Sequence, residues 1–179
     1  MKSKKTAGFT IIEMLVTVGV LTLLSGILIM YSKSSENASN LLRQAAKMVV
    51  DINQAKNLAM TTALFTNDEG EKIHPCGYGV YFDDKSTPNR YIIYADIAKD
   101  CKTSTHIRPS DGTTDVEIME LNTSISIDKK NIDSVFFLPP DPIVFFDPSE
   151  EKEGLITIKT ITGSQLEIKM SGAGQVSTF

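Results

Sequence analysis

The most pronounced hydrophobic pattern of the chain is an uninterrupted apolar block near its N-terminus. From Phe9 to Tyr31 the sequence has 23 residues and a single charged side chain, Glu13. As a helix this block would be about 34 Å long, which is enough to cross the hydrocarbon core of a bilayer. Three lysines and no acidic residue precede it. We therefore expect the N-terminus to stay in the cytoplasm and the rest of the chain to be exported.

A second pattern, with the period of a helix, follows the apolar block. Residues 32–40 are mostly polar, and beyond them apolar side chains recur every three or four residues, which predicts an amphipathic helix. Charged residues such as Asp51 fall largely outside this stripe. We expect one nearly continuous helix from about residue 9 to residue 65. The stripe consists of Leu41, Leu42, Ala45, Met48, Val49, Ile52, Ala55, Leu58, Ala59 and Thr62.

The pattern changes to that of β-strands after residue 66. The clearest strands are residues 155–161 and 165–170, which are joined by a turn at Thr162 and Gly163. Three prolines between residues 135–138 and 143–146 favour a turn or a sheet edge there. Together the strands predict an antiparallel sheet with one face against the helix, an α+β fold. The other candidate strands are residues 78–82, 90–95, 116–121 and 124–127.

These patterns divide the chain into a leader (residues 1–8), a transmembrane helix (9–31), its amphipathic continuation (32–66) and an extracytoplasmic β-sheet domain (67–179). A chain of 179 residues suffices for one domain with a core. Its formal charge is −4, and without the leader it has 15 basic and 22 acidic side chains, a net charge of −7. Because nucleic-acid binding depends on Lys and Arg neutralising phosphates, this charge disfavours nucleic acid as a partner.

Glu13 is the most informative residue of the apolar block. A carboxylate inside a membrane-spanning helix costs about 2.5–3.5 kcal/mol on insertion scales, so it normally has a partner. The block contains no Lys or Arg, but cleavage after Gly8 would create a new α-amino group at Phe9. Ordinary secretory signals are cut after the apolar stretch, whereas here the small residue precedes it. We expect the amine of Phe9, from the same chain or a neighbour, to neutralise Glu13.

The run Lys-Lys-Thr-Ala-Gly8-Phe9-Thr-Ile-Ile-Glu13-Met-Leu-Val resembles the N-terminal signature of type IV pilins and type II secretion pseudopilins. The resemblance implies a pilin-like fold and cleavage by prepilin peptidase between Gly8 and Phe9, with N-methylation of Phe9. It also implies that Glu13 acts in subunit registration. The implied partners are other pilin or pseudopilin subunits, prepilin peptidase, a membrane assembly platform and, before assembly, the lipid bilayer. Unlike many pilins, this helix has no proline before Pro75.

A narrower resemblance concerns the C-terminal half. The segment from Ile143 through Leu155 and Leu166 to Gly174 is similar to the corresponding part of H-type minor pseudopilins and related minor pilins. It favours a minor subunit over a major one. Such a subunit would lie first in the inner membrane and then in a pilus or pseudopilus, and it would be a structural protein without enzymatic activity or cofactor.

Cys76 and Cys101 are the two cysteines of the chain. In an exported domain they are expected to form a disulfide across a loop of about 25 residues, which would stabilise the fold by roughly 3.5 kcal/mol. Two alternatives remain open at this point. His74 and His106 lie near the cysteines in sequence, and four such ligands suit zinc; a cysteine–histidine nucleophile would use the same residues.

Asp147, Glu150, Glu151 and Glu153 form an acidic loop between two candidate strands. Carboxylate oxygens suit calcium, but such a loop is more often a solvated hairpin connection, and we expect the latter.

Two other functions use the same sequence features. The chain could be a binding module carried on a filament, for example for DNA uptake. It could also be an extracytoplasmic domain whose membrane anchor is never cut.

Overall fold

The computed structural model describes residues 10–67, 69–140, 143–147 and 152–179. Helix α1 (Ile11–Met60) comes first, and all the strands follow it. The chain separates into two compact units between Asn37 and Ala38, and α1 contributes to both. The expected start of the helix at Phe9 lies outside the described residues.

Helix α1 ends at Met60, five residues earlier than expected. Thr62 adopts a left-handed backbone conformation with φ of 47°. Its N–H donates to the carbonyl of Ala59 at 3.0 Å, and the N–H of Ala63 donates to the carbonyl of Leu58 at 3.0 Å. This is the Schellman arrangement that satisfies the last carbonyls of a helix. Thr62 therefore closes the helix instead of extending its apolar stripe.

The apolar stripe of α1 within the second unit is largely confirmed as the buried face. Two residues differ from the expectation: Leu42 is 60% exposed and Asp51 only 9% exposed. The hydroxyl of Tyr91 donates to the carboxylate of Asp51 at 2.5 Å, and this bond allows a charged group to be buried. The fully buried residues follow alternate spacings of four and three: Leu41, Ala45, Met48, Ile52, Ala55 and Ala59.

The strands form separate sheets, so the expectation of one sheet was wrong. The five-stranded sheet has the order β5-β4-β3-β7-β8, and the four-stranded sheet the order β11-β10-β9-β6, with all neighbours antiparallel. Strands β1 and β2 form a small hairpin. The bounds are β1 (Phe65–Thr66), β2 (Lys72–Ile73), β3 (Gly77–Asp83), β4 (Arg90–Asp96), β5 (Asp115–Glu120), β6 (Ile125–Lys130), β7 (Ser134–Leu138), β8 (Ile143–Asp147), β9 (Glu153–Thr160), β10 (Gln165–Ser171) and β11 (Val176–Thr178).

The turn between β5 and β6 connects the five-stranded sheet to the four-stranded sheet. Asn122 Oδ1 accepts from the N–H of Ser124 at 3.0 Å, and the N–H of Ile125 donates to the carbonyl of Asn122 at 2.8 Å. Strand β6 then pairs with β9, which lies almost thirty residues further along the chain. Alternation within a strand does not reveal such a partner, because it fixes only which side chains share a face.

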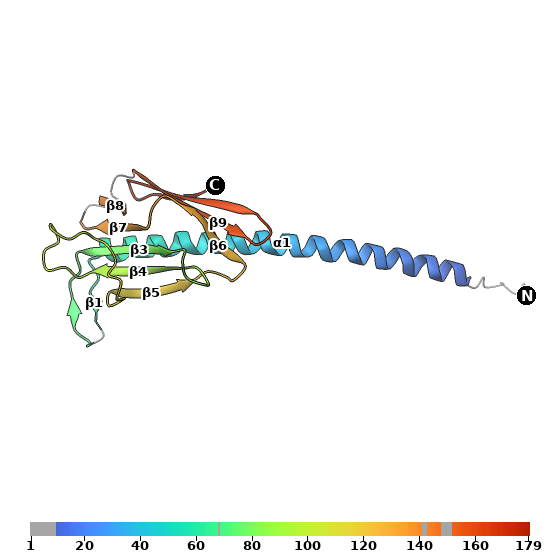
Figure 1. Ribbon diagram of the computed structural model, residues 1–179, viewed down its shortest axis with the longest axis horizontal. Coiled ribbons are helices and arrows are strands. Elements are labelled where there is room, and N and C mark those ends of the chain that lie inside the picture. Colours follow the sequence, from blue (N-terminus) through green and yellow to red (C-terminus); the bar gives the residue numbers. More distant parts are fainter. Residues whose placement is uncertain (1–9, 68, 141–142, 148–151) are drawn as a thin grey trace, which may run out of the picture. The chain divides into compact units, whose positions relative to one another are not determined.

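The two large sheets and α1 share one core in the second unit, where Figure 1 shows β3, β4 and β5 running along the helix. The inner face of the five-stranded sheet supplies large side chains such as Tyr78, Val80 and Phe82 to this core. The four-stranded sheet adds Ile158 and Ile168. The expected α+β, pilin-like fold is confirmed.

The outer face of the five-stranded sheet is also partly buried. Ile92 and Tyr94 point away from the helix, yet both are fully buried. Residues 97–114, between β4 and β5, form a loop that crosses this face; we call it the covering loop. Gly79 lies beneath the ring of Tyr94, and a Cβ there would stand 2.6 Å from the ring. The absence of a side chain at Gly79 therefore lets the Tyr94 ring lie on the strand.

Candidate functional site

The N-terminal end of α1 is closed by a reciprocal cap. The N–H and the hydroxyl of Thr10 each donate to Glu13 Oε2 at 2.9 Å, and the N–H of Glu13 donates to Thr10 Oγ1 at 3.3 Å. This arrangement is a capping box, in which a hydroxyl residue and an acid three positions later satisfy each other's backbone groups. The capping role of Thr10 was not predicted from the sequence, although Thr-Ile-Ile-Glu is the standard sequence signal of a capping box.

The first part of α1, Ile11–Leu28, exposes mostly apolar side chains. Residues Ile11–Leu28 have a mean hydropathy of 2.2, and none of this segment is buried. It is long and apolar enough to cross a membrane. Its hydroxyl groups are satisfied within the helix: Thr17, Thr22 and Ser25 donate to carbonyls three or four residues earlier at 2.8–2.9 Å. The segment can therefore enter lipid without unpaired hydroxyl groups.

Glu13 is the one charged residue of this apolar segment. Both Thr10 bonds go to Oε2, and Oε1 makes no hydrogen bond with any residue that the structure describes. A carboxylate can accept at both oxygens, so Oε1 remains available to an ammonium group. Gly8 and Phe9, the expected cleavage site and amine donor, lie outside the described residues.

Cys76 and Cys101 form a disulfide, with their Cα atoms 5.2 Å apart, as the sequence predicted. Because both sulfurs are in this bond, neither is a thiolate, the form that binds zinc or acts as a nucleophile. His74 is exposed. In the described parts of the chain no group of three or more His, Cys, Asp and Glu is placed to hold a metal ion. The disulfide fixes the covering loop to the start of β3.

His106 belongs to the covering loop, where it has a structural role and is not placed as a zinc ligand. It is buried, with a left-handed φ of 57°. Its Nδ1 lies 2.7 Å from Asp96 Oδ2, which also accepts from the hydroxyl of Ser104 at 2.6 Å. The imidazole stacks on the ring of Phe136 at 4.5 Å between centroids. The hydroxyl of Tyr94 donates to the carbonyl of His106 at 2.7 Å, so His106 anchors the loop to the sheet.

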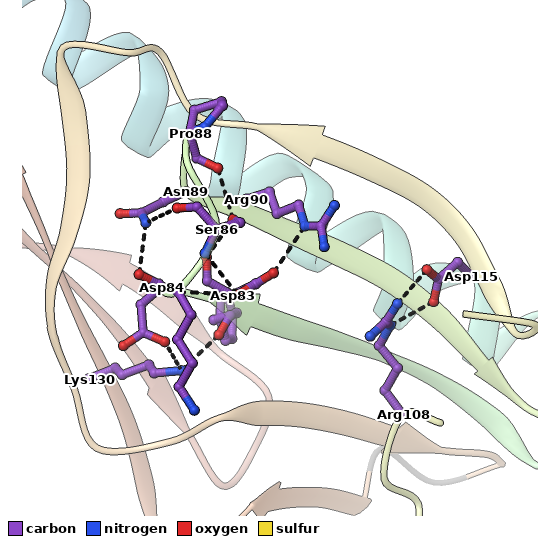
Figure 2. Close-up of polar contacts among 11 residues, drawn as sticks. Asp83, Asp84, Ser86, Pro88, Asn89, Arg90, Arg108, Asp115 and Lys130 are labelled. Atoms are coloured by element: carbon purple, nitrogen blue, oxygen red, sulfur yellow. Dashed lines mark hydrogen bonds and ion pairs between the residues drawn. The ribbon is translucent and has the colours of Figure 1, made fainter. Parts of the chain in front are cut away.

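A second set of charged residues lies around Tyr81, and Figure 2 shows its ion pairs. Lys130 donates to the carbonyl of Phe82 at 2.7 Å and pairs with Asp84 and Asp133 at 3.0 and 2.8 Å. Burial by itself would lower the pKa of Lys130, but the bonds to Asp133 and Asp84 outweigh it and raise the pKa. The ammonium thus joins the β3–β4 turn to the end of β6, a role that the sequence did not indicate.

Arg108 forms a second ion pair near Tyr81. Its guanidinium makes two bonds of 2.6 Å to the carboxylate of Asp115 (Figure 2). It also lies 5.5 Å from the centre of the Tyr81 ring. Both partners are mostly buried, and such paired contacts are among the stronger ion pairs in proteins. Arg108 therefore ties the covering loop to β5.

The expected acidic loop is only partly described. Glu150 and Glu151 lie outside the described residues. Asp147 ends β8, while Glu153 begins β9 and pairs with Lys169 at 2.6 Å. Calcium binding by this loop remains an alternative that the described residues do not test.

Comparison with known proteins gives one match, at the N-terminus. Residues 3–29 match the family described as the prokaryotic N-terminal methylation motif. This match spans the expected cleavage site, the Thr10–Glu13 cap and the apolar segment. Neither the curated proteins nor the solved structures gave a match to the chain.

Proposed function

Because residues 3–29 are the prepilin-type N-terminus of type IV pilins and pseudopilins, we propose that the chain is a minor pilin or pseudopilin. In this role it is a structural subunit of a type IV pilus or a type II secretion pseudopilus. The observation that carries the proposal is a lone carboxylate, Glu13, placed one turn inside an exposed apolar helix and within the methylation motif of residues 3–29. The choice of a minor subunit rests on the resemblance of residues 143–174 to H-type minor pseudopilins.

The mechanism follows from the chemistry of the helix end. Prepilin peptidase cuts between Gly8 and Phe9 and methylates the new amine. That ammonium pairs with Glu13, whose Oε1 is not used by the Thr10 cap. In a medium of low dielectric constant such a pair is weakly screened, so it sets the register between packed helices. The apolar surface of residues 11–28 then packs against the same surface of sister subunits.

The same segment determines where the chain resides. The apolar helix anchors the chain in a membrane, and the leader lysines keep its N-terminus in the cytoplasm. The disulfide-bonded domain then lies outside, in an oxidising compartment. From there an assembly platform transfers the subunit into the filament.

Two measurements test the proposal in a host that carries the filament genes. Intact-mass analysis of membrane-extracted protein should show loss of residues 1–8 and gain of one methyl group. Glu13→Gln and Glu13→Ala should be processed but should enter filaments poorly. Glu36→Gln is the matched control, because Glu36 is an exposed carboxylate on the same helix outside the apolar segment. A retained leader would identify an uncleaved anchor instead, and normal assembly of both Glu13 variants would refute the registration role.

A further inference from the structure

The outer face of the five-stranded sheet has an uncovered strip at its β8 edge. The covering loop buries the centre of this face but ends short of β8. As a result Ile143 is 52% exposed and Phe145 is 39% exposed. Ile107 of the loop, which lines the same cavity as Phe145, is 50% exposed. Exposed apolar side chains on an edge strand are a liability that proteins normally cover.

A cavity lies between the covering loop and β8. Its volume is about 380 Å³, within the range of sites that hold small ligands or single side chains. Phe136 and Phe145 supply aromatic walls, and His106, Ser134 and Asp147 supply polar groups. The imidazole of His106 lies 5.0 Å from the ring of Phe145, so loop and strand share this wall.

The charged residues around the cavity determine whether it favours a positively or a negatively charged group. Asp147 makes no side-chain hydrogen bond or ion pair with any residue that the structure describes, and no lysine or arginine lines the cavity. Asp96 lies behind His106. Burial raises the pKa of the Tyr94 hydroxyl, a hydrogen bond with Ser134 lowers it, and the nearby carboxylates of Asp96 and Asp147 raise it while Arg108 lowers it. Arg108, the nearby cation, is already paired with Asp115. An anion is therefore disfavoured, and a purely apolar occupant would desolvate Asp147 without compensation.

The position of β8 adds a second requirement. It is the last strand of its sheet in the described part of the chain, so its outer backbone groups can pair with an added strand. Along such a strand, alternate side chains face the same side as Phe145 and Asp147. A long aliphatic side chain with a cationic end would lie along the Phe145 ring and reach Asp147.

We propose that the β8 edge and its cavity bind an extended segment of a partner polypeptide, which inserts a lysine or arginine side chain between Phe145 and Asp147. Backbone pairing with β8 provides the orientation. The cavity provides the selectivity for a cation flanked by apolar residues. This proposal does not depend on cleavage or filament assembly, so it can fail or succeed independently of the proposed function.

Binding can be measured on the unprocessed full-length chain in detergent micelles. The ¹⁵N-labelled protein is titrated with acetyl-valyl-lysyl-valine amide and with its norleucyl and glutamyl counterparts. The lysyl peptide should shift amide signals of residues 143–147 and 105–107. It should bind about fivefold more tightly than the norleucyl peptide, the ratio that corresponds to about 1 kcal/mol from an ion pair or cation–π contact at a partly exposed site.

Variants locate the contact. Asp147→Asn should reduce lysyl binding to the norleucyl level, and Phe145→Ala should weaken both peptides. The matched controls lie on β5 at the opposite edge of the same sheet, where Glu120→Gln and Ile118→Ala replace an exposed acid and an exposed apolar residue. The spectrum of each variant shows directly whether it is folded.

Several outcomes would overturn the proposal. The three peptides could bind equally tightly, or the amide signals that shift could be those of β5. Millimolar peptide could also leave the amide signals unshifted. Finally, the signals of β8 could shift with protein concentration in the absence of peptide. The last would mean that the edge pairs with a second copy of the chain.

Discussion

Replacing Tyr91 by phenylalanine tests whether the buried contact between helix and sheet stabilises the domain. The ring of Tyr91 is fully buried and Asp51 is 9% exposed, with 2.5 Å between the two oxygens. Phenylalanine keeps the ring and so opens no large cavity, but it leaves the carboxylate without this donor. Hydrogen bonds to charged groups contribute about 1.5–3 kcal/mol. We therefore expect Tyr91→Phe to lower the free energy of unfolding by about 2–3 kcal/mol.

The pH dependence of the folding stability tests the same Tyr91–Asp51 contact independently. Burial, and then the hydrogen bond to Asp51, raises the pKa of Tyr91 above its ordinary value of 10.0. Below pH 10 both folded and unfolded chains keep the proton, so the stabilisation is fully present. Above pH 10 the unfolded chain releases a proton that the folded chain retains, so stability falls by up to about 1.4 kcal/mol per pH unit for each such tyrosine. Tyr78 and Tyr94 also have raised pKa values, so Tyr91→Phe should reduce this slope without abolishing it.

The assay is denaturant unfolding of the disulfide-intact chain, followed by far-ultraviolet circular dichroism between pH 7 and pH 11. Asp51→Asn is the companion variant, because an amide still offers an oxygen to the Tyr91 hydroxyl. The double variant should lose less than the sum of the two single losses, since the residues are in contact. A loss below about 0.5 kcal/mol for Tyr91→Phe, typical of surface changes, together with an unchanged slope above pH 10, would refute the reasoning.

Three further predictions concern the cap, the disulfide and the helix stripe. Thr10→Val should cost about 1 kcal/mol of helix stability, whereas Thr10→Ser should be nearly neutral; helicity in micelles measures both. Replacing Cys76 and Cys101 together by serine should lower stability by about 2–5 kcal/mol, and an unchanged melting temperature would contradict the role of the loop closure. Met48→Ala should cost about 2–5 kcal/mol, because Met48 is fully buried. Leu42→Ala should cost less than about 0.5 kcal/mol in the same unfolding assay, because Leu42 is mostly exposed.

The sequence by itself determined the features that depend on near neighbours along the chain. The apolar segment with its single carboxylate, Glu13, was evident from composition. The buried stripe of α1 followed from helical period, and the β9–β10 hairpin followed from alternation around Gly163, whose φ is 93°. The cysteine pairing was predicted from an even count in an exported domain. Each of these follows from local geometry or from the solvent that the segment must meet.

Only the tertiary structure decided the features that join distant parts of the chain. The separation into two large sheets depends on β6 choosing β9, which alternation cannot specify. The burial of Asp51 depends on a tyrosine forty residues away, and the stacking of His106 on Phe136 depends on a loop folding over a sheet. The periodicity of a helix or strand determines which face of the element a side chain lies on. Which residue that side chain contacts depends on how the elements pack against one another. For that reason the N-terminal segment could be predicted from sequence, whereas the cavity beside β8 could not.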